Sequence, residues 1–369
     1  FSLFNKEYCD YKNFFNDILE DLFYVALSVD LPDNYYPKLE CKVPFLNGGL
    51  FEPINDYNWK ETDITIKNET IKEIFDVFDT FNFTINEEES LEKDVAIDPE
   101  TLGKVFENLL DENLQRGHGV FYTPRNIVNY MSVSAIASYL TNELQSSYSF
   151  LDCKKFINEI NLSDLDHTDS FSKLNSQTSN FFKKNSDKID ELLKNIRICD
   201  PAVGSGAFPV SMMQIVVKLR KAIKVMNNQS NNNSNYQLKF HFIKNNIYGV
   251  DIDKSAVDIA KLRLWLSLTL DEENYEKIST LPNLDYKILQ GNSLFDDFGV
   301  NFISSENSQL SLDSSSSKKD ELIKKYFQKI KEFDYLNNQI QKKREREEIN
   351  NILKEIILSE IESAKSFDK

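Results

Sequence analysis

The chain has 369 residues, enough for two or three domains, and a formal net charge of −16, of which about −15 falls in residues 1 to 100. No stripe of Lys and Arg appears, which disfavours direct DNA binding by this chain alone, because DNA-binding surfaces need cations against phosphate. Four Cys without a Cys-x-x-Cys spacing and three widely separated His argue against a disulfide framework and a metal site, and favour a reducing compartment.

The first hundred residues are predicted to be mostly helical. Apolar side chains recur at helical spacing in residues 8 to 29 and again in residues 67 to 80. Asp98-Pro99-Glu100 is typical of a helix start and leads into a third apolar face. Between the first two helices lies an apolar loop, Val43 to Pro53, punctuated by Gly and Pro. Residues 1–97 are therefore predicted to form a helical domain.

A further helix is predicted over residues 127 to 140, after the segment Gly119 to Pro124. Thr123 at the N-cap and Pro124 at the first helical position would be ordinary helix-start chemistry. Residues 141 to 190 hold short polar helical pieces and Ser/Asn-rich joins. We interpret them as an insertion without a recognisable catalytic or binding motif.

Residues 196 to 219 predict a strand, a tight glycine turn and a helix, with the turn in Asp200-Pro-Ala-Val-Gly-Ser-Gly-Ala-Phe. Gly204 and Gly206 lack a Cβ, so the backbone can bend sharply and approach a ligand. We expect a Cβ at either glycine to clash with that ligand or to force an unfavourable backbone angle. Asp200 at the rim of the turn, with no Lys, suits a ligand carrying a cationic amine better than a pyrophosphate.

A second apolar strand is predicted over residues 247 to 253, followed by a helical run from 254 to 270. In nucleotide-binding α/β folds an acid at the end of this strand accepts hydrogen bonds from ribose hydroxyls, a role that fits Asp251. Ile252 is placed to pack on an adenine face, and Asp253 is predicted to cap the helix. The polar tract 227–235 makes the spacing from the turn unusually long, and we interpret it as a loop insertion.

The last part of the chain begins with a third strand, residues 286 to 289, which ends in Gln290-Gly291-Asn292-Ser293. Asn and Ser at this position are also common in plain turns. The Ser-rich stretch 304–317 is interpreted as a flexible linker. Apolar residues at spacings of three and four then recur from 323 to 361 and predict a long amphipathic helix or a helical hairpin. Packing of a hairpin on itself is the simplest interpretation, with dimerisation or DNA contact left open.

Several of these segments resemble motifs of S-adenosylmethionine-dependent DNA adenine-N6 methyltransferases. Residues 200–208 resemble motif I, with Val203 in place of the usual Cys; residues 121–124 resemble motif X, and residues 290–295 resemble motif III. The apolar loop at 46–51, Leu-Asn-Gly-Gly-Leu-Phe, resembles a connector segment of Type IIG (Type IIS) restriction–modification enzymes, where it lies between a nuclease and the methyltransferase. The resemblance covers about residues 41 to 300.

The resemblance implies S-adenosylmethionine as the cofactor. Motif X would hold the methionine end through its backbone and the Thr hydroxyl, and the strand-end residue of motif III would bond the adenine amino group. The cofactor-binding residues implied are Phe121, Tyr122, Thr123, Asp200, Ala202, Gly204, Gly206, Asp251, Ile252, Asn292 and Ser293.

The implied fold class is α/β: an incomplete Rossmann-like methyltransferase core with a helical N-terminal connector and a helical C-terminal insertion. The domains would be 1–97, the connector; 98–300, the methyltransferase with insertions 141–190 and 227–239; and 301–369, the linker and amphipathic segment. The implied function is site-specific methylation of an adenine flipped out of double-stranded DNA, in the cytoplasm, by a protein of a restriction–modification or phage-defence system that is fused to an endonuclease. No apolar run approaches the 18 residues of a membrane span.

Motif IV, Asn-Pro-Pro-Tyr or a relative, would bind the target amino group, and it does not occur in the 369 residues. We therefore name no catalytic residue and expect this chain alone to be inactive. Two alternatives remain. A Type I modification subunit has a similar motif order but would favour Gly at position 207, where this chain has Ala207. A non-catalytic cofactor-binding scaffold would have lost motif IV.

Overall fold

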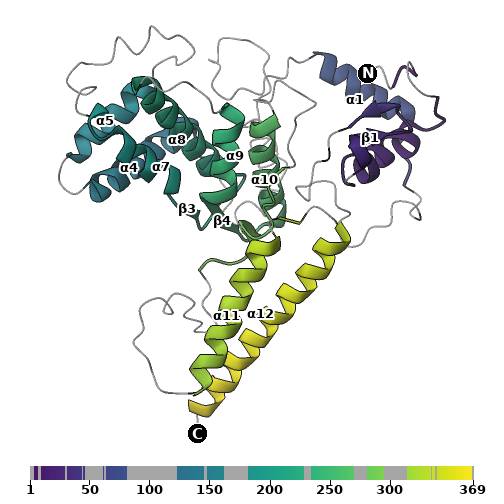
Figure 1. Ribbon diagram of the computed structural model, residues 1–369. Coiled ribbons are helices and arrows are strands. Elements are labelled where there is room, and N and C mark those ends of the chain that lie inside the picture. Colours follow the sequence, from purple (N-terminus) through teal and green to yellow (C-terminus); the bar gives the residue numbers. More distant parts are fainter. Residues whose placement is uncertain are drawn as a thin grey trace. The chain divides into compact units, whose positions relative to one another are not determined.

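The computed structural model describes residues 4–6, 10–29, 31–43, 45, 61, 64–80, 123–144, 148–161, 182–227, 234–269, 281–294, 314–333, 335–336 and 339–367 (Figure 1). The chain divides into two compact units, one over residues 66–292 and one that combines residues 2–65 with 293–369. Within the described residues, no helix has the length and apolar character needed to cross a bilayer.

A three-stranded parallel sheet lies in the first unit. Its strands are β3 (Ile198–Asp200), β4 (Ile247–Asp251) and β5 (Ile288–Gln290), in the order β3-β4-β5. Ile198 pairs with Ile247, and Gly249 pairs with Ile288. All three predicted strands are confirmed. Because the strands are parallel, their carboxyl ends meet at one edge of the sheet, where α/β folds bind ligands.

Helices α8 (Ala207–Met226) and α9 (Asn235–Asn245) connect β3 to β4, and α10 (Lys254–Thr269) follows β4. Helix α8 is the centre of the core, since α4 (Arg125–Glu143), α5 (Phe150–Asn161), α7 (Ser186–Asn195), α9 and α10 all contact it. Met213, Val216 and Leu219 of α8 are buried. The fold is therefore a mixture of helices and a parallel sheet, as the predicted α/β class requires.

The segment that we interpreted as a polar insertion contributes to this core. Phe156, Ile157 and Ile160 of α5 are fully buried, and the Phe156 ring stacks on Phe182 with 3.9 Å between ring centroids. Their spacing of three and four residues places them on one helical face, although Asp, Lys and Glu surround them in the sequence. The joins at 145–147 and 162–181 lie outside the described residues.

Two helix starts differ from the sequence prediction. Helix α4 begins at Arg125 with Pro124 as its N-cap, so Thr123 is one residue outside the position we expected, and no side chain caps this helix. The predicted polar insertion 227–239 ends sooner than expected, because α9 already begins at Asn235 and the Ser234 hydroxyl accepts a hydrogen bond from the Gln237 main chain. Residues 228–233 lie outside the described residues.

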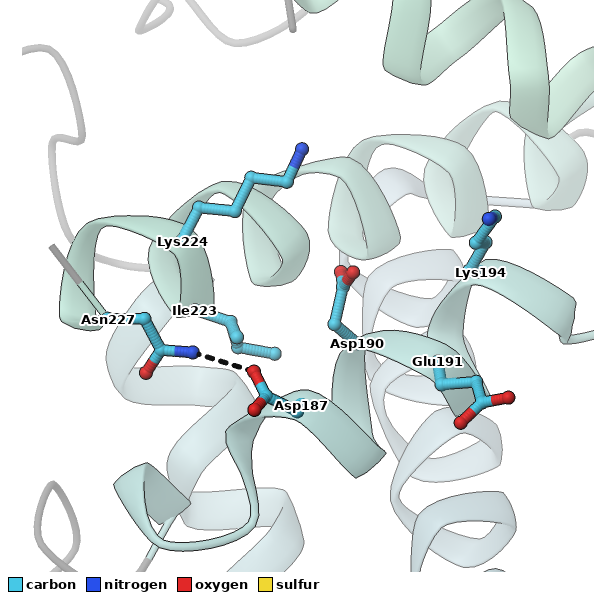
Figure 2. A pocket seen from close by; sticks show the side chains of 7 residues that line it. All are labelled: Asp187, Asp190, Glu191, Lys194, Ile223, Lys224 and Asn227. Carbon is cyan, nitrogen blue, oxygen red and sulfur yellow. Dashed lines mark hydrogen bonds between the residues drawn. The ribbon is translucent and has the colours of Figure 1, made fainter. Parts of the chain in front are cut away.

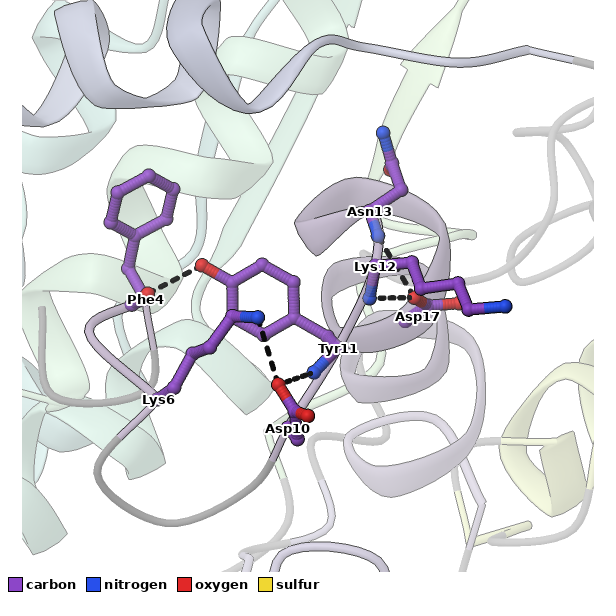
Figure 3. Close-up of polar contacts among 7 residues, drawn as sticks. All are labelled: Phe4, Lys6, Asp10, Tyr11, Lys12, Asn13 and Asp17. Carbon is purple, nitrogen blue, oxygen red and sulfur yellow. Dashed lines mark hydrogen bonds and ion pairs between the residues drawn. The ribbon is translucent and has the colours of Figure 1, made fainter.

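The N-terminal segment is helical from residue 14 to 26, with the π-helical turns η1 (Phe15–Leu19) and η2 (Leu22–Ala26). Asp17 accepts hydrogen bonds from the main-chain N–H groups of Lys12 and Asn13 at 2.8 and 2.9 Å, which lowers the pKa of its carboxyl group (Figure 3). The 3₁₀ turn η3 (Pro32–Asn34) leads into the short antiparallel pair β1 (Tyr35–Tyr36) and β2 (Cys41–Lys42).

The predicted helix over residues 67–80 is confirmed as α1 (Asn68–Thr80). Only Ile71 of its apolar face is buried, whereas Ile74 and Phe78 are exposed. The predicted helix after Asp98 and all of the apolar loop except Val43 and Phe45 lie outside the described residues.

The C-terminal segment is the predicted helical hairpin, formed by α11 (Ser314–Phe333) and α12 (Gln339–Phe367) (Figure 1). Ile323, Ile352 and Ile356 form its apolar seam. Helix α11 begins inside the stretch that we interpreted as a linker, since Ser314 to Ser317 are helical. The part of that stretch from 304 to 313 lies outside the described residues.

Candidate functional site

The glycine turn joins β3 to α8 and is tied to the neighbouring strand. The Val203 main-chain N–H donates to the Val250 carbonyl at 2.9 Å, and the Gly206 N–H donates to the Val203 carbonyl at 2.9 Å. Gly204 and Gly206 have positive φ angles of 51° and 86°, in the left-handed region that favours glycine. Gly206 is also the N-cap of α8, so the turn leads straight into the positive end of a long helix.

The two glycines meet different surroundings. A Cβ built on Gly204 would have no atom of the described residues within 4 Å, so space is open above this residue. A Cβ on Gly206 would lie 3.1 Å from both Cα and Cβ of Ala260 in α10. We expected both glycines to face the ligand. At Gly206, however, a side chain would press on α10 at a φ that favours glycine, whereas the space above Gly204 is open among the described residues.

Asp251 links the second strand to the turn. Its Oδ2 accepts a 2.8 Å hydrogen bond from the Gly204 main chain, and its Oδ1 accepts one of 3.0 Å from Asp253. A carboxylate offers about four lone-pair positions, so two stay available for further donors such as hydroxyl groups. The structure thus brings together Gly204 and Asp251, two residues that the sequence predicted for one site.

Asp253 has the capping role that the sequence predicted. Its Oδ1 accepts hydrogen bonds from the main-chain N–H groups of Ser255 at 2.7 Å and Ala256 at 3.3 Å, at the start of α10. These N–H groups have no partner within the helix, so the side chain satisfies them. The two acids of this segment therefore act on different partners.

Asp200 carries the least satisfied carboxylate of the site. Its Oδ1 accepts a 3.1 Å hydrogen bond from Ala202, whereas its Oδ2 is buried and has no hydrogen-bond partner among the described residues. Burial raises the pKa of Asp200, and the nearby negative charge of Asp251 raises it further. A buried acceptor without a donor, beside a second carboxylate, is an arrangement that a bound cation would relieve.

The third strand completes the same edge of the sheet. The Gly291 main-chain N–H donates to the Asp251 carbonyl at 2.8 Å, and the Gln290 side chain donates to the Ile252 carbonyl at 3.2 Å. Ile252 keeps 52% of its surface exposed, and Asn292 and Ser293 are exposed directly after β5. Gln290 is a contact that the sequence prediction missed, because it bonds main chain 38 residues away.

Motif X is described only in part. Thr123 is half-buried at the entry to α4, whereas Phe121 and Tyr122 lie outside the described residues. Helix α4 packs on α8, the helix that follows the glycine turn. No hydrogen bond between Thr123 and the strand-end residues is present in the structure, so its cofactor role stays a prediction.

A cavity of about 360 Å³ lies elsewhere, between α7 and the end of α8 (Figure 2). Its lining is mostly charged: Asp187, Asp190, Glu191, Lys194, Ile223, Lys224 and Asn227. It contains none of the predicted site residues, and the Asp190 carboxylate is already paired with the Arg220 guanidinium at 2.7 Å. No group of three or more His, Cys, Asp or Glu among the described residues could hold a metal ion.

Comparison with known proteins points to one family. Residues 245–369 match the Eco57I restriction-modification methylase family. Over 312 residues the chain is 35% identical to a protein of Methanocaldococcus jannaschii named as a putative type II restriction enzyme and methyltransferase. The chain is similar to restriction-modification methylases over these residues. That alignment spans 79% of this chain but only 25% of the relative.

The methylase match covers β4, α10, β5 and the C-terminal hairpin, and the glycine turn lies before it. It therefore includes Asp251, Ile252, Asn292 and Ser293 among the predicted site residues. A solved structure of the Type IIL restriction-modification enzyme MmeI in complex with DNA aligns with 78% of this chain and 33% of that chain, at 18% identity and a TM-score of 0.47.

Proposed function

We propose that this chain is the S-adenosylmethionine-binding part of a site-specific DNA adenine-N6 methyltransferase in a restriction-modification system. The observation that carries the proposal is the joining of the glycine turn to Asp251 through Gly204, beside a buried Asp200 oxygen that no donor of the described residues reaches. We infer that the three strands belong to a Rossmann-like core, whose ligand lies at the carboxyl ends of the strands.

The residues present fit this cofactor. Asp200 would balance the cationic amine, because its buried Oδ2 lacks a donor. Asp251 would accept from the ribose hydroxyls through the lone pairs that Gly204 and Asp253 leave open. Ile252 offers an exposed apolar surface for the adenine face. We further assign Phe121, Tyr122 and Thr123 to the methionine end, with Asn292 and Ser293 near the adenine.

When bound, the cofactor supplies an electrophilic methyl group on a sulfonium. The described residues bind and orient it: the turn comes close because Gly204 has no side chain, and the strand-end carboxylates hold the polar groups. Positioning of this kind accounts for a large part of catalysis in transfer reactions. The described residues therefore supply the methyl-donor half of the proposed reaction.

The partner in this proposal is double-stranded DNA, with the target adenine flipped out of the stack. The M. jannaschii relative is named as both a restriction enzyme and a methyltransferase, and the MmeI structure was solved with DNA. These names support a protein in which methylation and cleavage are joined. Because the substrate is cellular DNA, we place the enzyme in the cytoplasm.

Calorimetry with S-adenosylmethionine tests the cofactor assignment directly. The chain should bind S-adenosylmethionine and S-adenosylhomocysteine competitively, and NAD should not compete, since the turn carries a carboxylate where a pyrophosphate would lie. If the chain binds neither S-adenosylmethionine nor S-adenosylhomocysteine, the proposal is overturned. For the reaction, mass spectrometry of DNA methylated by the enzyme that contains this chain should find N6-methyladenine. Methylcytosine as the product would contradict the adenine assignment.

A further inference from the structure

A buried arginine contacts the glycine turn from behind. Arg263 lies on α10 with 3% of its surface exposed, and its Nη1 donates to the Ser205 carbonyl at 2.9 Å, with the Ser205 hydroxyl at 3.5 Å. Ser205 is itself buried and stands between the two glycines. One turn of α10 earlier, the Cα and Cβ of Ala260 lie 3.1 Å from the position that a Cβ of Gly206 would take. Helix α10 thus lies against two consecutive residues of the turn, Ser205 and Gly206.

The turn has a physical need for such support. Glycines on both sides of Ser205 have φ angles of 51° and 86°, and glycine adopts many other angles equally well. The orientation of the Ser205 peptide is therefore weakly fixed by local sterics. A charge-assisted hydrogen bond to its carbonyl selects one orientation. Burial of a guanidinium costs desolvation energy, so its presence here needs a reason beyond general stability.

We propose that Arg263 is a positioning residue that fixes the glycine turn in its cofactor-binding shape. It holds the Ser205 carbonyl toward α10, so that the Gly204 peptide stays aligned with Asp251 and the space above Gly204 stays open. Its effect on cofactor affinity rests on the proposed function, whereas its effect on the turn does not. Arg263 itself is buried behind the turn and is assigned no contact with the cofactor.

The chain provides a matched control in Arg220. This arginine of α8 is also buried, with 7% of its surface exposed, and it pairs with Asp190 of α7 through Nε at 2.7 Å and Nη2 at 3.3 Å. Arg263→Met and Arg220→Met each remove a buried guanidinium and keep an unbranched apolar side chain in its place. Only the first removes a contact with the turn.

Two measurements on the chain test the inference. Hydrogen exchange without ligand should show faster exchange at residues 204–207 in Arg263→Met by at least about tenfold, since a charge-assisted hydrogen bond is lost, and no such change in Arg220→Met. Calorimetry should show S-adenosylmethionine binding weakened by about tenfold to a hundredfold in Arg263→Met and within about twofold of the parent in Arg220→Met. Arg263→Lys should recover part of the affinity.

The outcomes separate the two proposals. If the parent chain binds no S-adenosylmethionine, the proposed function fails, and the exchange comparison still tests Arg263. If Arg263→Met exchanges and binds as Arg220→Met does, the positioning role is overturned. Should Arg263→Met fail to fold, Arg263→Lys and Arg263→Gln replace it. If these variants lose as much affinity and as much unfolding free energy as Arg220→Met does, Arg263 has only a structural role.

Discussion

The Gly204 main-chain N–H donates a 2.8 Å hydrogen bond to Oδ2 of Asp251, which lies 47 residues later in the chain. This bond joins the turn after β3 to the acid at the end of β4. The acid therefore has two tasks in the proposed site: it shapes the turn, and it offers its remaining lone pairs to a ligand. Substitutions of Asp251 report on both.

We predict that Asp251→Ala weakens S-adenosylmethionine binding by at least about tenfold, because hydrogen bonds to a carboxylate contribute about 1.5–3 kcal/mol each. Asp253→Ala should leave affinity nearly unchanged and lower the free energy of unfolding by about 1 kcal/mol, since it removes the cap of α10. Calorimetry and urea unfolding measure the two effects. A larger loss of affinity from Asp253→Ala than from Asp251→Ala would reverse these assignments.

The two glycines should respond differently to alanine. In Gly206→Ala the new Cβ would lie 3.1 Å from Ala260, at a φ of 86°, so the free energy of unfolding should fall by about 2 kcal/mol or more. In Gly204→Ala only the φ of 51° is unfavourable, which costs about 1 kcal/mol. The new Cβ at residue 204 should instead obstruct the cofactor. Binding should weaken by at least about tenfold, as expected when one good hydrogen bond between the chain and the cofactor is lost. Normal binding by Gly204→Ala would show that no ligand occupies that space.

The pH dependence of binding should depend on Asp200. Burial raises the pKa of its carboxyl group above the ordinary value, so the folded chain takes up its proton at a higher pH than the unfolded chain does. As the pH falls from about 7 through that raised pKa, Asp200 loses the charge that would hold the cationic amine, and affinity should decrease. Asp200→Asn should bind more weakly at about pH 7 and lack this part of the pH dependence.

The free energy of unfolding should change with pH in the opposite direction from the affinity. The raised pKa means that ionised Asp200 destabilises the folded chain. The free energy of unfolding should therefore rise as the pH falls from the raised pKa toward the ordinary one, because Asp200 becomes protonated in the folded chain first. Asp200→Asn should therefore be more stable than the parent at about pH 7, and the difference should shrink on acidification. Thermal unfolding across this range checks the sign. A difference that grows on acidification contradicts it.

The C-terminal hairpin should depend on its apolar seam more than on its ion pairs. Ile356 is fully buried, and Ile356→Ala should lower the free energy of unfolding of the hairpin by about 2–4 kcal/mol. Lys329 pairs with Glu345 and with Glu348, the latter at 2.8 Å, but these side chains are partly exposed. Lys329→Ala should cost only about 0.5–1 kcal/mol. Hydrogen exchange of α11 and α12 distinguishes the two, and a larger effect of Lys329→Ala would contradict the ranking.

Much of the fold was predictable, because its signals are local. The strands β3, β4 and β5 are apolar runs that end in polar residues, and the glycines mark the turn. Helix α5 was misread as part of a polar insertion, since its buried face consists of a few apolar residues among charged ones. Overall polarity concealed a periodicity that places Phe156 and Ile160 in the core.

The turn and the strand ends that form the candidate site could be predicted from the sequence, but the contacts between them could not. Asp253 could be recognised as a cap because capping acts within one helical turn. The contacts of Ala260 with Gly206 and of Arg263 with Ser205 join residues more than fifty positions apart, so no local pattern announces them. The sequence predicted that a Cβ at Gly206 would meet a ligand or an unfavourable backbone angle; the φ of 86° agrees with the second reason, and the closeness of α10 is a further reason that no local pattern reveals.

The order of synthesis gives the bond between Gly204 and Asp251 one more consequence. Helices α8 and α9 separate the two residues, so the turn has no acceptor for its N–H until the second strand has been made and docked. Contacts of long sequence separation form late, because the intervening chain must first be closed into a loop. A nascent chain that ends before residue 251 would carry the turn sequence without its shape. Cofactor should then stabilise only chains in which both strands are paired, and so act as a check on completed folding.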